Sequence, residues 1–118
     1  MAAEKNFENR LKDYLDKIGA WYIKYWAGSK FTKEGIPDII ACYKSRFIAI
    51  EVKGKKGKPS LLQLVTLRKI RLSKGYGILL YPEDFDGFKK FINGEGDGFS
   101  WYVSNLEKQD NWYNKLNT

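Results

Sequence analysis

Two apolar runs separated by only two residues constrain the fold of this chain more than any other feature. They extend from Asp38 to Tyr43 and from Arg46 to Lys53, and Lys44-Ser45 forms a link short enough for an antiparallel hairpin. The second run alternates between two faces. Ile48, Ile50 and Val52 point one way, and Phe47, Ala49, Glu51 and Lys53 point the other. The middle of the chain is therefore predicted to lie in a sheet.

Helical periodicity and further strand signals surround this hairpin. Apolar residues at helical spacing predict a helix over residues 5–18 that Gly19 ends, and Ser60 begins a second helix reaching about Lys74. A third, weaker helix is expected over residues 83–92. The remaining strands are predicted over 21–27, 77–81 and 99–103, and the tail from Asn105 is ambiguous.

The order of these segments predicts an α/β fold with a mixed central sheet flanked by helices. A helix between two strands permits them to pair in parallel, whereas the hairpin strands are antiparallel. The 118 residues carry no internal repeat or linker, and 43% of them are hydrophobic. We therefore expect a single domain over residues 1–118 with one core.

The charge balance favours a polyanionic partner. Lys and Arg number 21 against 14 Asp and Glu, and the net charge of +7 suits nucleic acid, although a soluble protein that happens to be basic is the simpler alternative. The N-terminus is too charged for a signal peptide, and no apolar run reaches the length of a membrane span. We expect no membrane partner and a cytoplasmic protein, in the host cytoplasm if a phage encodes it.

The absence of histidine narrows the possible chemistry. With no histidine and a single cysteine, Cys42, the chain lacks His–Cys zinc sites, Ser–His–Asp triads and any intrachain disulfide. Catalysis must then use carboxylates, lysine, hydroxyl groups or a metal held by oxygen ligands.

Three charged side chains at the ends of the hairpin strands could supply such a site. Glu51 and Lys53 lie two apart on one strand and share a face, and Asp38 begins the partner strand. Two adjacent carboxylates repel unless a cation separates them, and Mg²⁺, for which Mn²⁺ should substitute, prefers oxygen ligands such as these and the Val52 carbonyl. Lys53 would then activate water and stabilise the transition state of phosphodiester hydrolysis. The alternative is a turn at Pro37 followed by a solvated sheet face.

The segment GIPDIIACYKSRFIAIEVKGKKGKPSLLQ resembles the PD-(D/E)xK nuclease superfamily, which has a restriction-endonuclease-like core. Within it, the pattern is similar to VRR-NUC domains over about residues 8 to 80. The resemblance implies that Asp38, Glu51 and Lys53 occupy the metal-binding and catalytic positions, and that Gln63 is the helical glutamine of the site. Because Ser60 and Gln63 also form a capping-box pattern, helix capping alone would explain Gln63.

The chain is also similar to archaeal Holliday junction resolvases. The shared features include Glu8 on the first helix and the segment from Ala27 to Lys30. This resemblance implies that Glu8 assists catalysis, through a second metal or by orienting Lys53, and that Ser29 serves the site. Glu4 lies on nearly the same helix face and competes with Glu8, and an acid near a helix N-terminus needs no catalytic role.

Contacts with DNA are expected from the loops on either side of the acidic pair. Ser29 and Lys30 precede Asp38 in the chain, and a lysine-rich loop follows Lys53. Its members, which could hold phosphates that flank the cut, are Lys55, Lys56 and Lys58. A solvated turn is the alternative for this loop.

Aromatic side chains could stack on bases, but buried positions are the more common use of such residues. We expect the core for those of the first strand, which are Trp21, Tyr22, Tyr25 and Trp26. For some of the C-terminal ones we expect a subunit interface, the candidates being Trp101, Tyr102, Trp112 and Tyr113.

Together these features predict a Mg²⁺-dependent endonuclease that hydrolyses DNA phosphodiester bonds and selects branched DNA such as Holliday junctions. Cutting two strands of a junction symmetrically needs two active sites, so a homodimer is expected. The alternatives are a nuclease of other specificity (flap, nicking or linear DNA) and a nucleic-acid-binding module that has lost catalysis.

Overall fold

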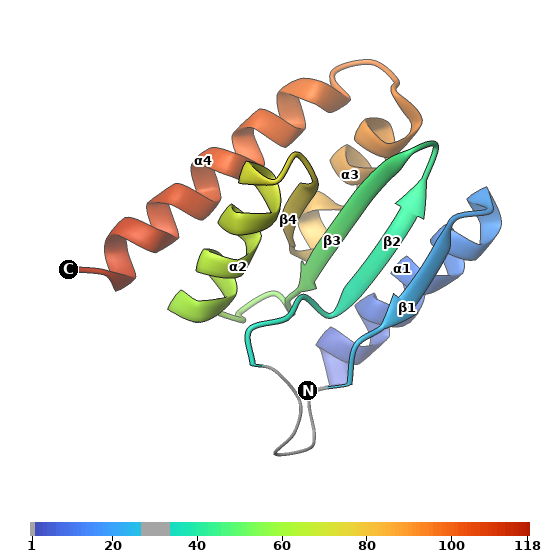
Figure 1. Ribbon diagram of the computed structural model, residues 1–118. Coiled ribbons are helices and arrows are strands. Elements are labelled where there is room, and N and C mark those ends of the chain that lie inside the picture. Colours follow the sequence, from blue (N-terminus) through green and yellow to red (C-terminus); the bar gives the residue numbers. More distant parts are fainter. Residues whose placement is uncertain (1, 27–33) are drawn as a thin grey trace.

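A four-stranded mixed sheet forms the centre of the computed structural model, which describes residues 2–26 and 34–118 (Figure 1). The strands are β1 (Trp21–Lys24), β2 (Ile39–Tyr43), β3 (Arg46–Val52) and β4 (Tyr76–Leu80), and they lie side by side in that order. β1, β2 and β3 pair antiparallel, whereas β3 and β4 are parallel. The predicted mixed sheet is confirmed, although β1 ends three residues earlier than the predicted strand over 21–27.

Helices cover both faces of the sheet, as predicted. The helical elements are α1 (Ala2–Ile18), α2 (Leu61–Leu72), the short 3-10 helix η1 (Pro82–Asp84), α3 (Phe85–Asn93) and α4 (Gly98–Leu116). α1 and α3 pack on the face that carries Ile48 and Ile50, and α2 packs on the other face against Leu79. No helix within residues 2–26 and 34–118 has the length and apolar composition that crossing a membrane would require.

The hairpin of β2 and β3 fixes the register on which the candidate site depends. Its link, Lys44-Ser45, has positive φ at both residues (49° and 66°), the conformation of a type I′ turn. This turn matches the right-handed twist of the strands and pairs Tyr43 with Arg46 and Ile39 with Ile50. Asp38 therefore lies one residue before β2, opposite Glu51.

The C-terminal region is helical, so the strand predicted over 99–103 is wrong. Its aromatic and β-branched residues favour a strand locally, but α4 places Tyr102, Asn105 and Gln109 on one buried face. The Asn105 side-chain amide donates to the Leu79 carbonyl at 2.8 Å and accepts from the Leu79 N–H at 3.1 Å. Gln109 donates to the Gly77 carbonyl at 2.9 Å. These bonds satisfy the backbone of β4, the edge strand, and this tertiary gain outweighs local propensity.

The core position predicted for the aromatic residues of the first strand is only partly confirmed. Tyr22 packs against the main core, but Trp21 and Trp26 are 63% and 68% exposed. Trp21 and Phe47 share the face of the sheet opposite α1, because both pair across Cys42. α2 covers this face over β3 and β4, and the part formed by β1 and β2 is left exposed.

Candidate active site

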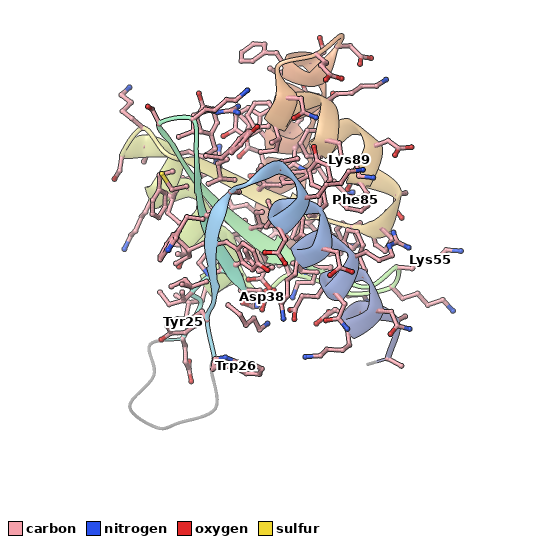
Figure 2. The ribbon with its side chains drawn as sticks, turned by 90° about the vertical axis from the view of Figure 1, so that its right-hand side faces the viewer. Tyr25, Trp26, Asp38, Lys55, Phe85 and Lys89 are labelled. Atoms are coloured by element: carbon pink, nitrogen blue, oxygen red, sulfur yellow. The ribbon has the colours of Figure 1, made fainter. Side chains whose placement is uncertain are left out.

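The ends of β2 and β3 bring Asp38 and Glu51 together. The Asp38 Oδ2 atom accepts a hydrogen bond from the Val52 N–H at 2.8 Å, which fixes its carboxylate against the end of β3. Gly35, three residues before Asp38, packs closely on α2: its φ of +78° favours glycine, and an added Cβ would lie 2.6 Å from Leu62 Cγ. Figure 2 shows Asp38 beside α1, at the end of the molecule where Trp26 also lies.

Glu51 is a buried carboxyl group beside a second carboxylate. The residue is 2% exposed, and its Oε1 atom has no hydrogen-bond partner among the residues that the structure describes. Burial raises the pKa of Glu51 to about 8, the Asp38 carboxylate adds to that rise, and the Lys53 ammonium opposes it. A cation bound here would stabilise the ionised form of Glu51, because its positive charge would offset both the burial and the repulsion from Asp38.

Lys53 is the third member of the group. Its Nζ atom lies 3.3 Å from Glu51 Oε2, and its side chain is only 12% exposed. The loop that follows packs on its aliphatic stem, since a Cβ on Gly57 would lie 3.3 Å from Lys53 Cβ. The Tyr81 hydroxyl donates to the Gly57 carbonyl at 2.7 Å and anchors this loop. The ammonium group is therefore held in place beside the Glu51 carboxyl group.

A second network, which the sequence reasoning missed, lies on the α1 side of Asp38. Lys24 donates to Glu8 Oε1 at 2.6 Å, and its Nζ atom lies 3.5 Å from Asp38 Oδ1. Lys12 lies 3.3 Å from Glu8 Oε2. In the structure Glu8 thus contacts Lys24 rather than Lys53, so the predicted orienting of Lys53 by Glu8 is not observed. Tyr22 and Lys24 alternate toward α1, and this periodicity in the sequence could have identified Lys24.

The structure also distinguishes Glu8 from Glu4, the other acidic residue on this side of α1. Glu8 is 4% exposed and points to Lys24, whereas Glu4 accepts a hydrogen bond from the Gly54 N–H at 3.3 Å. Burial would raise the pKa of Glu8, but hydrogen bonds and charges from Lys24 and Lys12 outweigh it and lower the pKa. Glu8 is therefore the helical acid linked to Asp38, and Glu4 contacts the lysine-rich loop.

Replacing Lys24 with methionine should destabilise the protein by about 2 kcal/mol, less than for a fully buried pair because Lys12 still faces Glu8. The loss arises because the Glu8 carboxylate stays buried after its closest cation is removed. Urea unfolding measures the effect. The Glu8→Gln/Lys24→Met double variant should recover part of the loss, and an unchanged free energy of unfolding in Lys24→Met would contradict the expectation.

The geometry fits a divalent cation held by few protein ligands. Within residues 2–26 and 34–118, no group of three or more Asp, Glu or Cys side chains forms a complete metal cage. Mg²⁺ is commonly held by one or two carboxylates and keeps several waters, so Asp38 and Glu51 suffice. The Lys53 N–H donates to the Leu80 carbonyl on β4. The backbone of Val52 therefore points the other way, toward Asp38, and its carbonyl could add a third oxygen.

The raised pKa of Glu51 predicts a pH dependence of stability in the metal-free protein. Between the ordinary value of 4.5 and about 8, the folded state keeps a proton that the unfolded state has lost. Folding then takes up a proton, so the contribution of Glu51 to stability falls as pH rises through this window. Urea unfolding across this range in EDTA should show a smaller decline for Glu51→Gln than for the wild type. Parallel pH profiles would contradict this prediction.

The remaining predicted site residues fall in three places. Gln63 forms the expected capping box, since its side chain accepts from the Ser60 N–H at 2.9 Å. This confirms its capping role, and a role in the active site stays a prediction. Lys55, Lys56 and Lys58 are exposed on the loop after Lys53. Ser29 and Lys30 lie outside the described residues.

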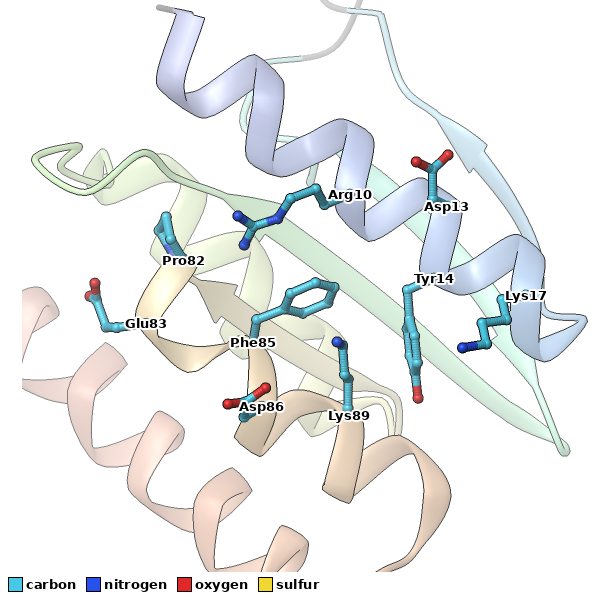
Figure 3. A pocket seen from close by; sticks show the side chains of 9 residues that line it. All are labelled: Arg10, Asp13, Tyr14, Lys17, Pro82, Glu83, Phe85, Asp86 and Lys89. Atoms are coloured by element: carbon cyan, nitrogen blue, oxygen red, sulfur yellow. The ribbon is translucent and has the colours of Figure 1, made fainter.

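Two cavities differ in their relation to this group. A small one of about 230 Å³ lies against Asp38, and Glu8, Lys24 and Trp26 also line it. A larger one of about 610 Å³ lies between α1 and α3, lined by residues such as Arg10, Tyr14, Phe85 and Lys89 (Figure 3). Because none of the acidic pair or Lys53 borders the larger cavity, the smaller one is the candidate entrance to the site.

Comparison with known proteins identifies the family. The model of the archaeal Holliday junction resolvase family matches residues 2–110. The chain belongs to the archaeal Holliday junction resolvase family. The predicted resemblance is thereby confirmed, and the expectation of a nuclease that acts on DNA is confirmed at the level of the family.

One solved structure similar to this resolvase-family chain is Hjc, a Holliday junction resolvase from the archaeal hyperthermophile Archaeoglobus fulgidus. The two chains are 32% identical, the alignment covers 66% of this chain and 69% of that one, and the TM-score is 0.44. A comparison with curated proteins gives no match.

Proposed function

We propose that this chain is a metal-dependent endonuclease that resolves four-way DNA junctions. The observation that carries the proposal is the buried Glu51 carboxyl group, with an oxygen that lacks a hydrogen-bond partner among the described residues, between Asp38 and Lys53. A fold that only bound DNA would gain nothing from a buried carboxyl group placed beside a second, half-buried carboxylate at a strand end. Membership of the resolvase family supports junctions as the substrate.

Asp38, Glu51 and the Val52 carbonyl would hold Mg²⁺, with Mn²⁺ as a substitute. When bound, the cation would neutralise phosphate charge and lower the pKa of a water molecule. The chain has no histidine to act as a general base, so this water would supply the hydroxide nucleophile. Lys53 would donate hydrogen bonds to the phosphate oxygens on which negative charge accumulates in the transition state. Its pairing with Glu51 already holds the ammonium group there before substrate binds.

Glu8 would act through Lys24 as a positioning residue. Lys24 lies between the Glu8 and Asp38 carboxylates, so it restricts the orientation of Asp38 and offsets its negative charge. The exposed lysines at 55, 56 and 58 would contact phosphates beside the cut. Such contacts make affinity depend on salt, with log K falling by about 0.9 per phosphate for each log unit of salt.

Paired cuts in a junction require two copies of this site, and a twofold homodimer would supply them. The exposed part of the sheet opposite α1 is the surface that we assign to the second copy. Trp21, Ile23 and Phe47 are exposed there, and contiguous apolar surface of this kind is unusual on a monomer. Sedimentation of the wild type against Ile23→Glu tests this assignment, and a monomeric wild type would contradict it.

A panel of end-labelled substrates tests the proposed activity. A four-way junction, a flap, a nicked duplex and a linear duplex are incubated with Mg²⁺, Mn²⁺ or Ca²⁺. The expected result is symmetric paired cleavage of the junction with Mg²⁺ or Mn²⁺. Preferred cleavage of another substrate would assign a different nuclease specificity. Binding without cleavage in every metal would favour a DNA-binding module without catalysis.

A further inference from the structure

Trp26 is a large aromatic residue in an unusual position beside the candidate site. It follows β1, and its side chain is 68% exposed, whereas a tryptophan that stabilises a fold is normally mostly buried. Lys24 and Trp26 are two apart, and both border the small cavity that reaches Asp38. Figure 2 shows Trp26 at the edge of the molecule near Asp38.

The Trp26 ring and the cations near it are the two features by which proteins bind single nucleotides. The ammonium groups of Lys5 and Lys24 lie 5.6 and 5.7 Å from the ring centroid. The Lys5 side chain is 55% exposed, so its ammonium group is accessible to a phosphate group of bound DNA. An exposed aromatic ring next to cations is the arrangement by which proteins hold an unpaired base together with its backbone.

We propose that Trp26 stacks on a nucleobase next to the phosphate that is cut, in the strand that enters the Asp38 cavity. This inference rests on the proposed nuclease function and extends it, because it assigns a base-contacting residue to the site. Perfect duplex does not offer an unstacked base, whereas a branch point does. Trp26 would thereby contribute to the selection of branched DNA, while Asp38, Glu51 and Lys53 perform the chemistry.

The competing explanation is structural, with Trp26 only shielding the Lys24–Glu8 ion pair from water. The two explanations predict different effects when Trp26 is replaced by leucine or by phenylalanine. Leucine keeps an apolar cover but has no π face, and phenylalanine keeps both. The exposed Phe99 at the start of α4 provides a matched control, because it is an exposed aromatic residue that lines neither the small cavity nor the Asp38 site.

The experiment uses the full-length protein and a four-way junction with 2-aminopurine placed on either side of the mapped cut. Binding is measured with Ca²⁺, and cleavage with Mg²⁺. Wild type and Trp26→Phe should quench the fluorescence of one 2-aminopurine position. Trp26→Leu and Trp26→Ala should lose this quenching and raise KM for the junction about tenfold, the loss of one stacked base, with little change in kcat. Phe99→Ala should match the wild type.

The outcomes separate the inference from the function on which it rests. If the wild type cuts junctions but Trp26→Leu retains both quenching and KM, the stacking role is overturned. A lower unfolding midpoint in Trp26→Leu with an unchanged KM would favour the structural explanation and also overturn it. A wild type that cuts no DNA would contradict the proposed function itself.

Discussion

Glu51→Gln should cut junction DNA at least about 10³-fold more slowly than the wild type, which corresponds to about 4 kcal/mol of lost transition-state stabilisation. The amide has nearly the same shape as the carboxylate but no charge to hold a cation. The same change should leave the metal-free protein at pH 8 as stable as before or more stable, since it removes a buried carboxyl group that Asp38 disfavours when ionised. A loss of cleavage activity combined with unchanged or higher stability would indicate that Glu51 serves catalysis rather than folding.

Single-turnover cleavage with Mg²⁺ and urea unfolding in EDTA measure the two effects. Glu83→Gln is the matched control, because Glu83 is exposed and borders the larger cavity, which neither Asp38 nor Lys53 lines. It should change neither quantity. Near wild-type cleavage by Glu51→Gln would refute the assigned role, and strong destabilisation would mean that Glu51 is a structural residue.

Lys53→Ala should reduce kcat by about 10² to 10³, the usual effect of removing one preorganised group that stabilises transition-state charge. KM should change little, because the mostly buried Lys53 side chain faces Glu51 and is proposed to contact only the reacting phosphate, not the flanking DNA backbone. The measurement is a steady-state comparison on a junction substrate with Mg²⁺.

Lys55→Ala provides the contrast for Lys53→Ala. Lys55 is exposed on the following loop, so its loss should raise KM and reduce the salt dependence of binding while kcat is retained. If the two variants show the same pattern, Lys53 is only one more phosphate contact. If Lys53→Ala keeps full kcat, the proposed stabilisation of the transition state is wrong.

The candidate site was predictable from sequence to the extent that strand geometry determines it. The short link at Lys44-Ser45 fixes the hairpin, and the hairpin register places Asp38 opposite Glu51. Residue alternation then puts Glu51 and Lys53 on one face. These three positions follow from local rules, and for that reason the sequence sufficed to bring them together.

The parts that were not predicted depend on contacts between elements distant in the sequence. Lys24 acquires its importance only when α1 packs on the sheet and brings Glu8 within 2.6 Å. Asn105 and Gln109 look unremarkable in a polar tail until α4 lies along β4. Trp26 belongs to a strand-like aromatic run, and the early end of β1 leaves it exposed.

Calorimetric titration of Mn²⁺ into the metal-free protein at pH 7 tests the convergence of Asp38 and Glu51 most directly. Because the pKa of Glu51 is about 8, its carboxyl group is mostly protonated at this pH. Saturable binding should release close to one proton per ion, seen as a dependence of the heat on the ionisation enthalpy of the buffer. Glu51→Gln should weaken binding and remove the proton release. Equal binding by wild type, Glu51→Gln and Asp38→Asn, with no proton released, would contradict the site described above.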